Sequence, residues 1–568
     1  MVRMVARPCV VLGRGTRTLA VAMLSVPACI PAQETRETQT LGARTISHNE
    51  QLRPSSPARI QPEPIRNTGN RLPVDQARSV PVLKKAAEQG DAIAQFNLGG
   101  AYYFGEGVPQ DHAEGVRWWK KAADQGNAKA QFLLGVACEQ GEGVPKDSGE
   151  AVRWYKKAAD QGLADAQCLL GVAYHFGRGV PQDHAEAVRW YKKAADQGDA
   201  DAQNSLGVAY YYGKGVPQDP AEAVRWYRKA ADQGDANAQV NLGSAYRDGK
   251  GVPQDHAESV RWYKKAADQG DDDAQVNLGV AYEQGEGVPK DSAEAVRWYK
   301  KAADQGDASA QFNLGLAYHF GKGVPQDDAE AVRWSRKAAD QGDARAQFNV
   351  GLAYDLGRGV PQDRAEAVRW LRKAADQGDA RAQFSLGIAY DQGKGVPQDY
   401  GEAAHWYKKA ADQGNAKAQL NLGYAYYHGE GVPQDRTEAV LWCKKAADQG
   451  DATAQALIGL AYYHGEGVPQ DRAEAVRWYR KAADQGDPDA QFNLGLAYSN
   501  GEGVPKDNAK AYFWANLAAA LSKDAEQDSS ARLRDSIAAK LSPGQMSAIQ
   551  KKCRQWMDAF EKRQGQER

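Results

Sequence analysis

Residues Asp451–Gly486 read DATAQALIGLAYYHGEGVPQDRAEAVRWYRKAADQG, and close copies of this stretch follow one another through most of the 568-residue chain. The proline of its Gly-Val-Pro segment, Pro469, recurs every 36 residues from Pro109 to Pro505, which gives twelve copies without an insertion. A constant period of this size indicates a solenoid, in which each unit buries its apolar face only against its neighbours. The sequence therefore predicts one repeat array instead of several globular domains.

Each unit is expected to contain two helices with explicit start and stop signals. In the first unit, helix A begins after Asp91, whose carboxylate can accept from the free N–H groups of the first turn, and it ends at Gly105. Helix B opens with Asp111 and Glu114, a spacing typical of a capping box. Gly99 recurs inside helix A in every copy and costs about 1 kcal/mol of helix propensity. Close approach of the partner helix would offset that cost, so the pattern predicts tightly packed antiparallel hairpins and an all-α fold.

Three repeated segments carry a family resemblance: Ala-x-Ala-Gln-x-x-Leu-Gly-x-Ala-Tyr, Gly-x-Gly-Val-Pro-Gln-Asp and Ala-Val-Arg-Trp-Tyr-Lys-Lys-Ala-Ala-Asp-Gln-Gly. They resemble the Sel-one-like repeat (SLR), a relative of the tetratricopeptide repeat, over residues 91–522. The resemblance implies a right-handed α-solenoid of about twelve helix-turn-helix repeats that acts as an interaction scaffold, and it implies no particular reaction. Residues 75–90 are expected to form a degenerate N-terminal cap helix, and residues 523–568 a C-terminal helical cap.

The N-terminal segment predicts export. Residues 1–28 place four arginines before a short apolar run and small residues at a cleavage position, as in a signal peptide. Cys29 follows directly and is a candidate for lipid attachment, although Pro27 is unfavourable in a lipoprotein signal. Residues 29–74 are polar and rich in proline, which predicts a disordered linker. We expect an exported protein that is periplasmic, outer-membrane-associated or secreted.

Composition and motifs argue against several classes of protein. The chain has 72 Lys and Arg against 73 Asp and Glu, so it offers no net basic surface for a nucleic acid. No stretch approaches 18 apolar residues, so no transmembrane span is predicted. His112, His184 and His256 share one repeat position but stand two repeats apart, too far to share a metal ion. The paired acids at the start of helix B are explained by capping. We therefore predict no catalytic, cofactor-binding or metal-binding residues, and no enzyme.

Positions that vary on a constant scaffold are the candidates for partner binding. One position of helix A carries asparagine in seven copies: Asn97, Asn241, Asn277, Asn313, Asn349, Asn421 and Asn493. In tetratricopeptide relatives an asparagine at the matching place can face the concave groove and bond a peptide backbone, and the resemblance implies the same role here. The alternative is a polar residue satisfied by water or by the neighbouring helix.

The end of helix A carries a second set of candidates, which are aromatic: Tyr103, Phe104, Tyr211, Tyr212, Tyr427 and Tyr463. Such residues can anchor a partner, or they can pack locally against the glycine-rich loop. Together the patterns predict an exported, non-enzymatic scaffold that binds a protein or peptide through the concave face of its A helices. The alternatives are an exported cell-wall-active or ligand-binding enzyme built on the same repeats, and a purely structural spacer.

Overall fold

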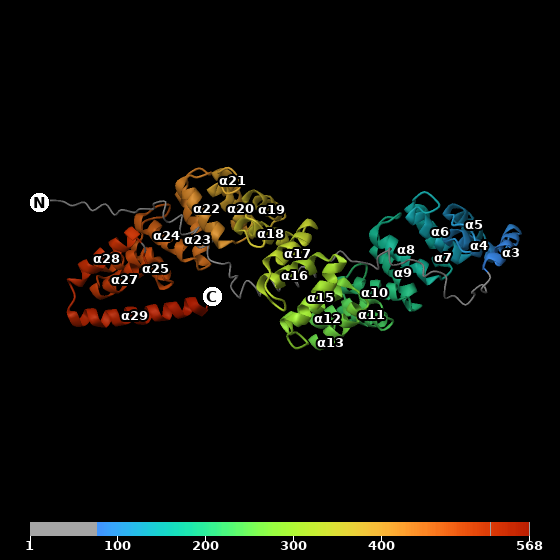
Figure 1. The fold of residues 1–568 in the computed structure, drawn as a ribbon, viewed down its shortest axis with the longest axis horizontal. Coiled ribbons are helices and arrows are strands. Elements are labelled where there is room, and N and C mark those ends of the chain that lie inside the picture. The colour runs from blue at the N-terminus through green and yellow to red at the C-terminus, as the bar shows by residue number, and fades with distance from the viewer. Residues whose placement is uncertain (1–75, 523, 567–568) are drawn as a thin grey trace. The chain divides into compact units, whose positions relative to one another are not determined.

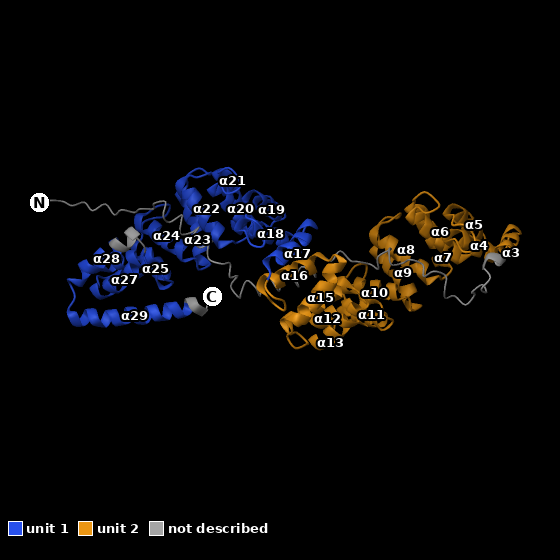
Figure 2. Cartoon of the chain, in the orientation of Figure 1, with its two compact units in different colours: residues 1–44, 327–568 blue, residues 45–326 orange. Residues whose placement is uncertain are grey.

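The computed structural model describes residues 76–522 and 524–566, and all regular elements within these residues are α-helices (Figure 1). A first helix, α3 (Gln76–Glu88), precedes the twelve repeats, in each of which an A helix is followed by a B helix. These findings confirm the predicted all-α repeat fold. The described residues divide between Gln326 and Asp327 into two compact units (Figure 2).

The unit that ends at Gln326 contains seven A helices: α4 (Ala92–Phe104), α6 (Ala128–Gln140), α8 (Ala164–Phe176), α10 (Ala200–Tyr212), α12 (Ala236–Asp248), α14 (Asp272–Gln284) and α16 (Ala308–Phe320). Its B helices are α5 (His112–Asp124), α7 (Ser148–Asp160), α9 (His184–Asp196), α11 (Pro220–Asp232), α13 (His256–Asp268) and α15 (Ser292–Gln305).

The unit that begins at Asp327 contains five A helices: α18 (Ala344–Leu356), α20 (Ala380–Gln392), α22 (Ala416–His428), α24 (Ala452–His464) and α26 (Pro488–Asn500). Its B helices are α17 (Asp328–Asp340), α19 (Arg364–Asp376), α21 (Tyr400–Asp412), α23 (Arg436–Asp448), α25 (Arg472–Asp484) and α27 (Asn508–Leu521). Two further helices follow, α28 (Asp524–Ala538) and α29 (Pro543–Gln566).

The A helices begin and end as their sequence predicts. Asp91 Oδ1 accepts from the Ala94 N–H at 2.7 Å, and Gly105 closes α4 in the left-handed region at φ 74°. The other A helices have the same caps, except that Leu163 leaves α8 without a side-chain bond. Glycine is required at the C-terminal cap because other residues rarely adopt that backbone conformation.

The B helices form only half of the predicted capping box. Asp111 Oδ1 accepts from the Glu114 N–H at 3.0 Å, but the backbone N–H of Asp111 donates to the carbonyl of Tyr102 at 2.8 Å. The Glu114 carboxylate turns instead to Arg117, 3.3 Å away. The prediction of a reciprocal bond is therefore wrong, because the loop between the helices supplies the acceptor that the glutamate was expected to provide.

The recurring glycine of helix A allows the two helices of a repeat to touch. A Cβ atom on Gly135 would lie 2.6 Å from two ring carbons of Tyr155, and one on Gly459 would lie 2.5 Å from the ring of Tyr479. No real side chain tolerates such distances, so the aromatic ring of helix B occupies the space that the glycine leaves. This contact supports the predicted reason for the glycine.

The tryptophan of helix B joins each repeat to the preceding one. Trp298 of α15 is 3% exposed and belongs to a core cluster with Val260 of α13 and Leu278 of α14. Its indole N–H donates to Glu294 Oε1 at 3.0 Å, and Lys301 Nζ lies 3.8 Å from the centre of its ring. The same lysine contact recurs in other repeats, so the lysine covers a tryptophan as well as the end of its helix.

A ladder of glutamines also connects the helices, with a buried glutamine in helix A and an exposed one at the end of helix B. Gln455 Nε2 donates to the carbonyl of Ala447 in the preceding B helix at 3.1 Å, and Gln455 Oε1 accepts from Gln485 Nε2 at 2.9 Å. In the twelfth repeat Leu521 stands where the second glutamine would be, so Gln491 Oε1 is buried without a partner. The ladder thus lacks its last bond.

The C-terminal helices α28 and α29 pack on α27. Cys553 of α29 is buried, and Phe560 lies over Gly486 at the end of the preceding repeat. Among the helices of the described residues, none combines the length and the apolar character needed to cross a membrane. The predicted export signal (1–28), Cys29 and the predicted linker (29–74) lie outside the described residues.

Candidate partner-binding surface

The seven asparagines of the candidate site lie near the middle of their A helices, where most of them are half-buried. Asn277 is buried more deeply, with 7% of its surface exposed. Within the described part of the chain, five of the seven have no hydrogen-bond partner for their side chains: Asn97, Asn313, Asn349, Asn421 and Asn493. These five amides are therefore free to bond water or a ligand.

The other two asparagines are already engaged with neighbouring A helices. Asn241 Nδ2 donates to Asn204 Oδ1 at 2.9 Å, and Arg247 Nη1 approaches Asn277 Oδ1 at 3.4 Å. The predicted ladder thus consists of two kinds of amide. In α12 and α14 they support the repeat array, as the alternative interpretation expects.

Three of the candidate tyrosines are tied to the loop of the following repeat. The Tyr427 hydroxyl donates to Glu466 Oε2 at 2.6 Å, and equivalent bonds join Tyr103 to Glu142 and Tyr463 to Glu502. Burial, together with the bond to Glu466, raises the pKa of Tyr427 to about 12. These rings therefore link successive repeats, and their hydroxyl groups are already satisfied.

The remaining aromatic candidates differ in exposure. Phe104 is half-buried and packs edge-on against Tyr103, with 5.1 Å between ring centres. Tyr211 is half-buried beneath Lys250, whose ammonium lies 5.4 Å from its ring centre, whereas Tyr212 is exposed. The structure therefore brings these rings together in pairs within a repeat, and Tyr212 is the one most accessible to a partner.

Charged residues gather at the starts of the A helices, one turn before the asparagines. Arg345 and Arg381 occupy this place in α18 and α20, and each is paired with its own N-cap aspartate, at 2.7 and 2.8 Å. In α26 the same place holds Asp489, and burial raises the pKa of the N-cap Asp487 to about 7. The charge on this edge therefore differs from one helix to the next.

One acidic group has the spacing of a metal site. Within the described residues, Asp271, Asp272 and Asp273 place ligand oxygens within 4.8 Å of one another. Asp271 Oδ1, however, accepts from the Ala274 N–H at 2.9 Å as the cap of α14. Capping explains the position of this carboxylate, and we assign no metal to the group.

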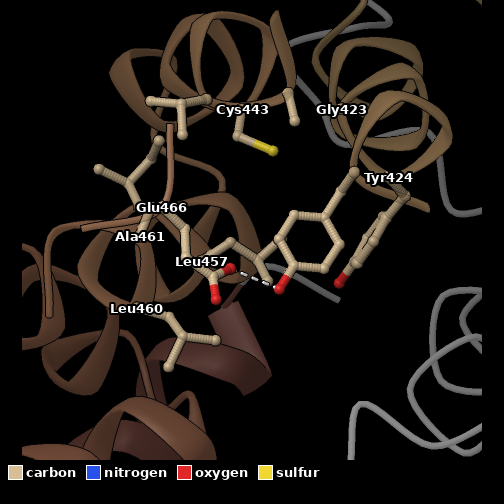
Figure 3. Close-up of a pocket in the computed structure, with 11 residues that line it drawn as sticks. Gly423, Tyr424, Cys443, Leu457, Leu460, Ala461 and Glu466 are labelled. Atoms are coloured by element: carbon tan, nitrogen blue, oxygen red, sulfur yellow. Dashed lines mark hydrogen bonds between the residues drawn. The ribbon is translucent and has the colours of Figure 1, made fainter. Parts of the chain in front are cut away.

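A small cavity between α22, α23 and α24 was not found by sequence reasoning (Figure 3). Tyr424 and Tyr427 of α22, Cys443 of α23, Leu457 of α24 and Glu466 of the following loop are among the residues that line it. Burial raises the pKa of Cys443 to about 12, so its thiol is protonated at neutral pH. The only sequence signal was a cysteine where most repeats carry tyrosine.

Comparison with known proteins places the repeat array in a family. The Sel1 repeat model matches twelve consecutive segments, the first at residues 92–127 and the last at 488–523. No curated protein is matched by the chain.

A solved structure gives the same result. A protective antigen present in uropathogenic Escherichia coli strains, which displays an SLR fold, is 36% identical; the match covers 83% of this chain and 97% of the antigen, with a TM-score of 0.59. A Sel1 repeat protein from Oxalobacter formigenes is 40% identical over 54% of this chain and 89% of its own, with a TM-score of 0.44. Sel1 repeat proteins generally mediate protein–protein interactions and are typically non-catalytic. With twelve matched repeats that span most of its length, the chain belongs to the Sel1 repeat family.

Proposed function

We propose that this chain is an exported, non-enzymatic scaffold that binds a protein or peptide partner through the face of its A helices. The observation that carries the proposal is the set of five asparagine side chains that are half-buried yet have no partner in the described chain. None of these five amides is among the fully buried, unpaired groups of the described chain, so each can bond water in the free protein. A ligand backbone that replaces this water would gain about 0.5–1.5 kcal/mol for each hydrogen bond.

Two further observations support the location and the kind of partner. The 36% identical relative is a protective antigen present in uropathogenic Escherichia coli strains, a role that is compatible with export. Asparagine side chains both donate and accept, so they suit the alternating N–H and carbonyl groups of a peptide backbone. The scaffold would recognise the shape and backbone of its partner more than the partner's sequence.

The binding face is tested by site-specific photo-crosslinking in the full chain. Lys417 of α22 and Lys444 of α23 are both exposed, but the first lies one turn before Asn421 on an A helix and the second lies on a B helix. A photoreactive residue at 417 should capture a partner that the same residue at 444 does not. Equal capture at both positions would contradict the assignment of the face.

Export is tested by fractionating cells that express either the full chain or a variant without residues 1–28. The full chain should leave the cytoplasm and the truncated chain should stay in it. Retention of both would show that residues 1–28 are not an export signal.

A further inference from the structure

The cavity beside Cys443 has the place and the neighbours of a tyrosine ring. At the equivalent position of other B helices a tyrosine packs against the glycine of helix A: Tyr155, Tyr191, Tyr227, Tyr263, Tyr299, Tyr407 and Tyr479. In the tenth repeat Gly423 is kept, but Cys443 replaces the ring. A side chain of one sulfur cannot fill the volume of a phenol group, and unfilled volume in a packed core is rare.

The next repeat serves as an internal reference for this cavity. Residues 426–431 and 462–467 have the same sequence, Tyr-Tyr-His-Gly-Glu-Gly, so the loops and the ends of the two A helices match. In that repeat Tyr479 lies beside Gly459 and is buried at 2% exposure. The tenth repeat differs from this reference at Cys443, where the ring is lost, and also at Tyr424, which lines the cavity and stands where the eleventh repeat has Leu460.

The cavity also offers a partner for a phenol hydroxyl. Where the ring is present, its hydroxyl can donate to a carboxylate: Tyr155 donates to Glu139 at 2.7 Å and Tyr299 donates to Glu283 at 2.9 Å. Those glutamates stand at the helix A position that Tyr427 occupies in the tenth repeat. There a different carboxylate, Glu466 of the following loop, lines the cavity (Figure 3), and its Oε2 accepts from Tyr427. A carboxylate has about four acceptor positions, so Glu466 can accept a second hydroxyl.

We propose that this cavity is a binding site for a phenol ring, supplied either by a tyrosine side chain of another protein or by a free phenolic molecule. The ring would pack between the side chains of Leu457, Val440 and Tyr424, beside Cys443. The proposal goes beyond the scaffold function, because a free phenol needs no protein partner. The cavity measures about 40 Å³, against the ~150 Å³ cavity that holds benzene. A phenol ring therefore enters only in part unless neighbouring side chains move, and the dissociation constant should be weak, about millimolar.

The site is tested with p-cresol, the side chain of tyrosine as a free molecule, by equilibrium dialysis against the full chain. The wild type should bind it saturably, Cys443→Tyr should lose one site per chain, and Tyr479→Cys should gain one. Cys443→Leu is a second blocking variant, since Leu371 occupies this position in another repeat. Circular dichroism checks that each variant is folded. No saturable binding to the wild type, or binding unchanged in both folded blocking variants, would overturn the proposal.

Two further ligands test whether the phenol hydroxyl contributes to binding and whether the ring can belong to a protein chain. Toluene lacks the hydroxyl and should bind about tenfold more weakly than p-cresol, the loss expected for one hydrogen bond. Equal affinity would refute the assignment to a phenol. The blocked tripeptide acetyl-Gly-Tyr-Gly-amide should displace p-cresol if the ring can be carried on a protein chain. If the tripeptide does not displace p-cresol, a free phenol is the ligand, and the proposal stands in that form. These assays need no partner, so their failure is separate from a failure of the crosslinking experiment.

Discussion

A pair of glycine substitutions tests whether the ring of helix B explains the glycine of helix A. Gly459 faces Tyr479, and an added Cβ atom would lie 2.5 and 2.6 Å from two ring carbons and 3.2 Å from the carbonyl oxygen of Ala475. Gly495 is its equivalent in the last repeat, where Ala515 replaces the ring. Its added Cβ atom would meet its nearest neighbours, both backbone atoms, at 3.3 Å. The two sites thus share a helix position and differ in one neighbour.

The expected free energies follow from two opposing terms. Alanine gains about 1 kcal/mol of helix propensity over glycine at either site. At Gly459 the methyl group must displace a rigid ring, which costs about 3 kcal/mol, at the upper end for overpacking. Gly459→Ala should therefore destabilise its repeat by about 2 kcal/mol, whereas Gly495→Ala should be neutral or stabilise by up to ~1 kcal/mol.

The assay is amide hydrogen exchange, because unfolding in a repeat array can be local. Protection of the α24 and α25 amides should fall in Gly459→Ala, and protection of α26 and α27 should hold or rise in Gly495→Ala. In a Tyr479→Ala background, Gly459→Ala should change sign and stabilise, which gives a coupling energy of about 3 kcal/mol between the two residues. If Gly459→Ala costs the same with and without the ring, the steric explanation is refuted.

Trp298→Ala should lower the free energy of unfolding by about 3–5 kcal/mol. Because the Trp298 ring lies in the core shared with the preceding repeat, denaturation should then occur in two transitions. One cooperative transition with an unchanged midpoint would contradict this. Gln455→Leu removes the partner of the buried Ala447 carbonyl and of the exposed Gln485 amide, while Gln491→Leu also removes an oxygen that Leu521 already leaves unsatisfied. Chemical denaturation should therefore show a loss about 0.5–1.5 kcal/mol larger for the first, the net value of one hydrogen bond, and equal losses would exclude the bond between the two glutamines as a stabilising feature. Burial raises the pKa of Asp487 to about 7, so the folded chain holds this proton more tightly than the unfolded chain, and the free energy of unfolding should fall as pH rises from about 4 to 7. Asp487→Asn keeps a good N-cap and should reduce that fall, to which burial of Asp165, Asp199, Asp484 and Asp489 also contributes by raising their pKa values. A pH profile that stays the same would show that the Asp487 carboxyl does not titrate there.

The fold could be predicted from sequence because each signal in a repeat is local and occurs twelve times. Asp91, Gly105 and Asp111 mark helix ends by their own backbone chemistry, and Gly99 marks a helix contact without any knowledge of the partner residue. The prediction that Glu114 would bond the backbone N–H of Asp111 was wrong because that bond is not determined locally. The loop brings the carbonyl of Tyr102 to the Asp111 N–H instead, and the spacing of residue types along the sequence does not predict this contact.

The candidate site was less accessible to sequence reasoning, because it depends on contacts between repeats. Nothing local distinguishes Asn241, which bonds Asn204, from Asn313, which has no partner in the described chain. The cavity beside Cys443 is a similar case. A small residue in an aromatic position signals lost volume, but only the structure shows that a cavity of about 40 Å³ remains beside it.

The residues at the end of helix A differ between repeats because they contact the loop of the next repeat, which sequence comparison of the repeats alone does not show. Tyr427 and Tyr463 each bond a glutamate 39 residues further along the chain, in the next repeat. Tyr211 has Lys250 at that distance, and there the lysine lies over the ring instead. Residues at this position thus vary together with the loop that they touch, as expected of contacts that hold neighbouring repeats together. At the central position of helix A, five of the seven asparagines have no such partner in the described chain, and an amide left free there has no structural use for its hydrogen bonds. For this reason the asparagines without partners, more than the aromatic rings, are where a ligand of this scaffold should be sought.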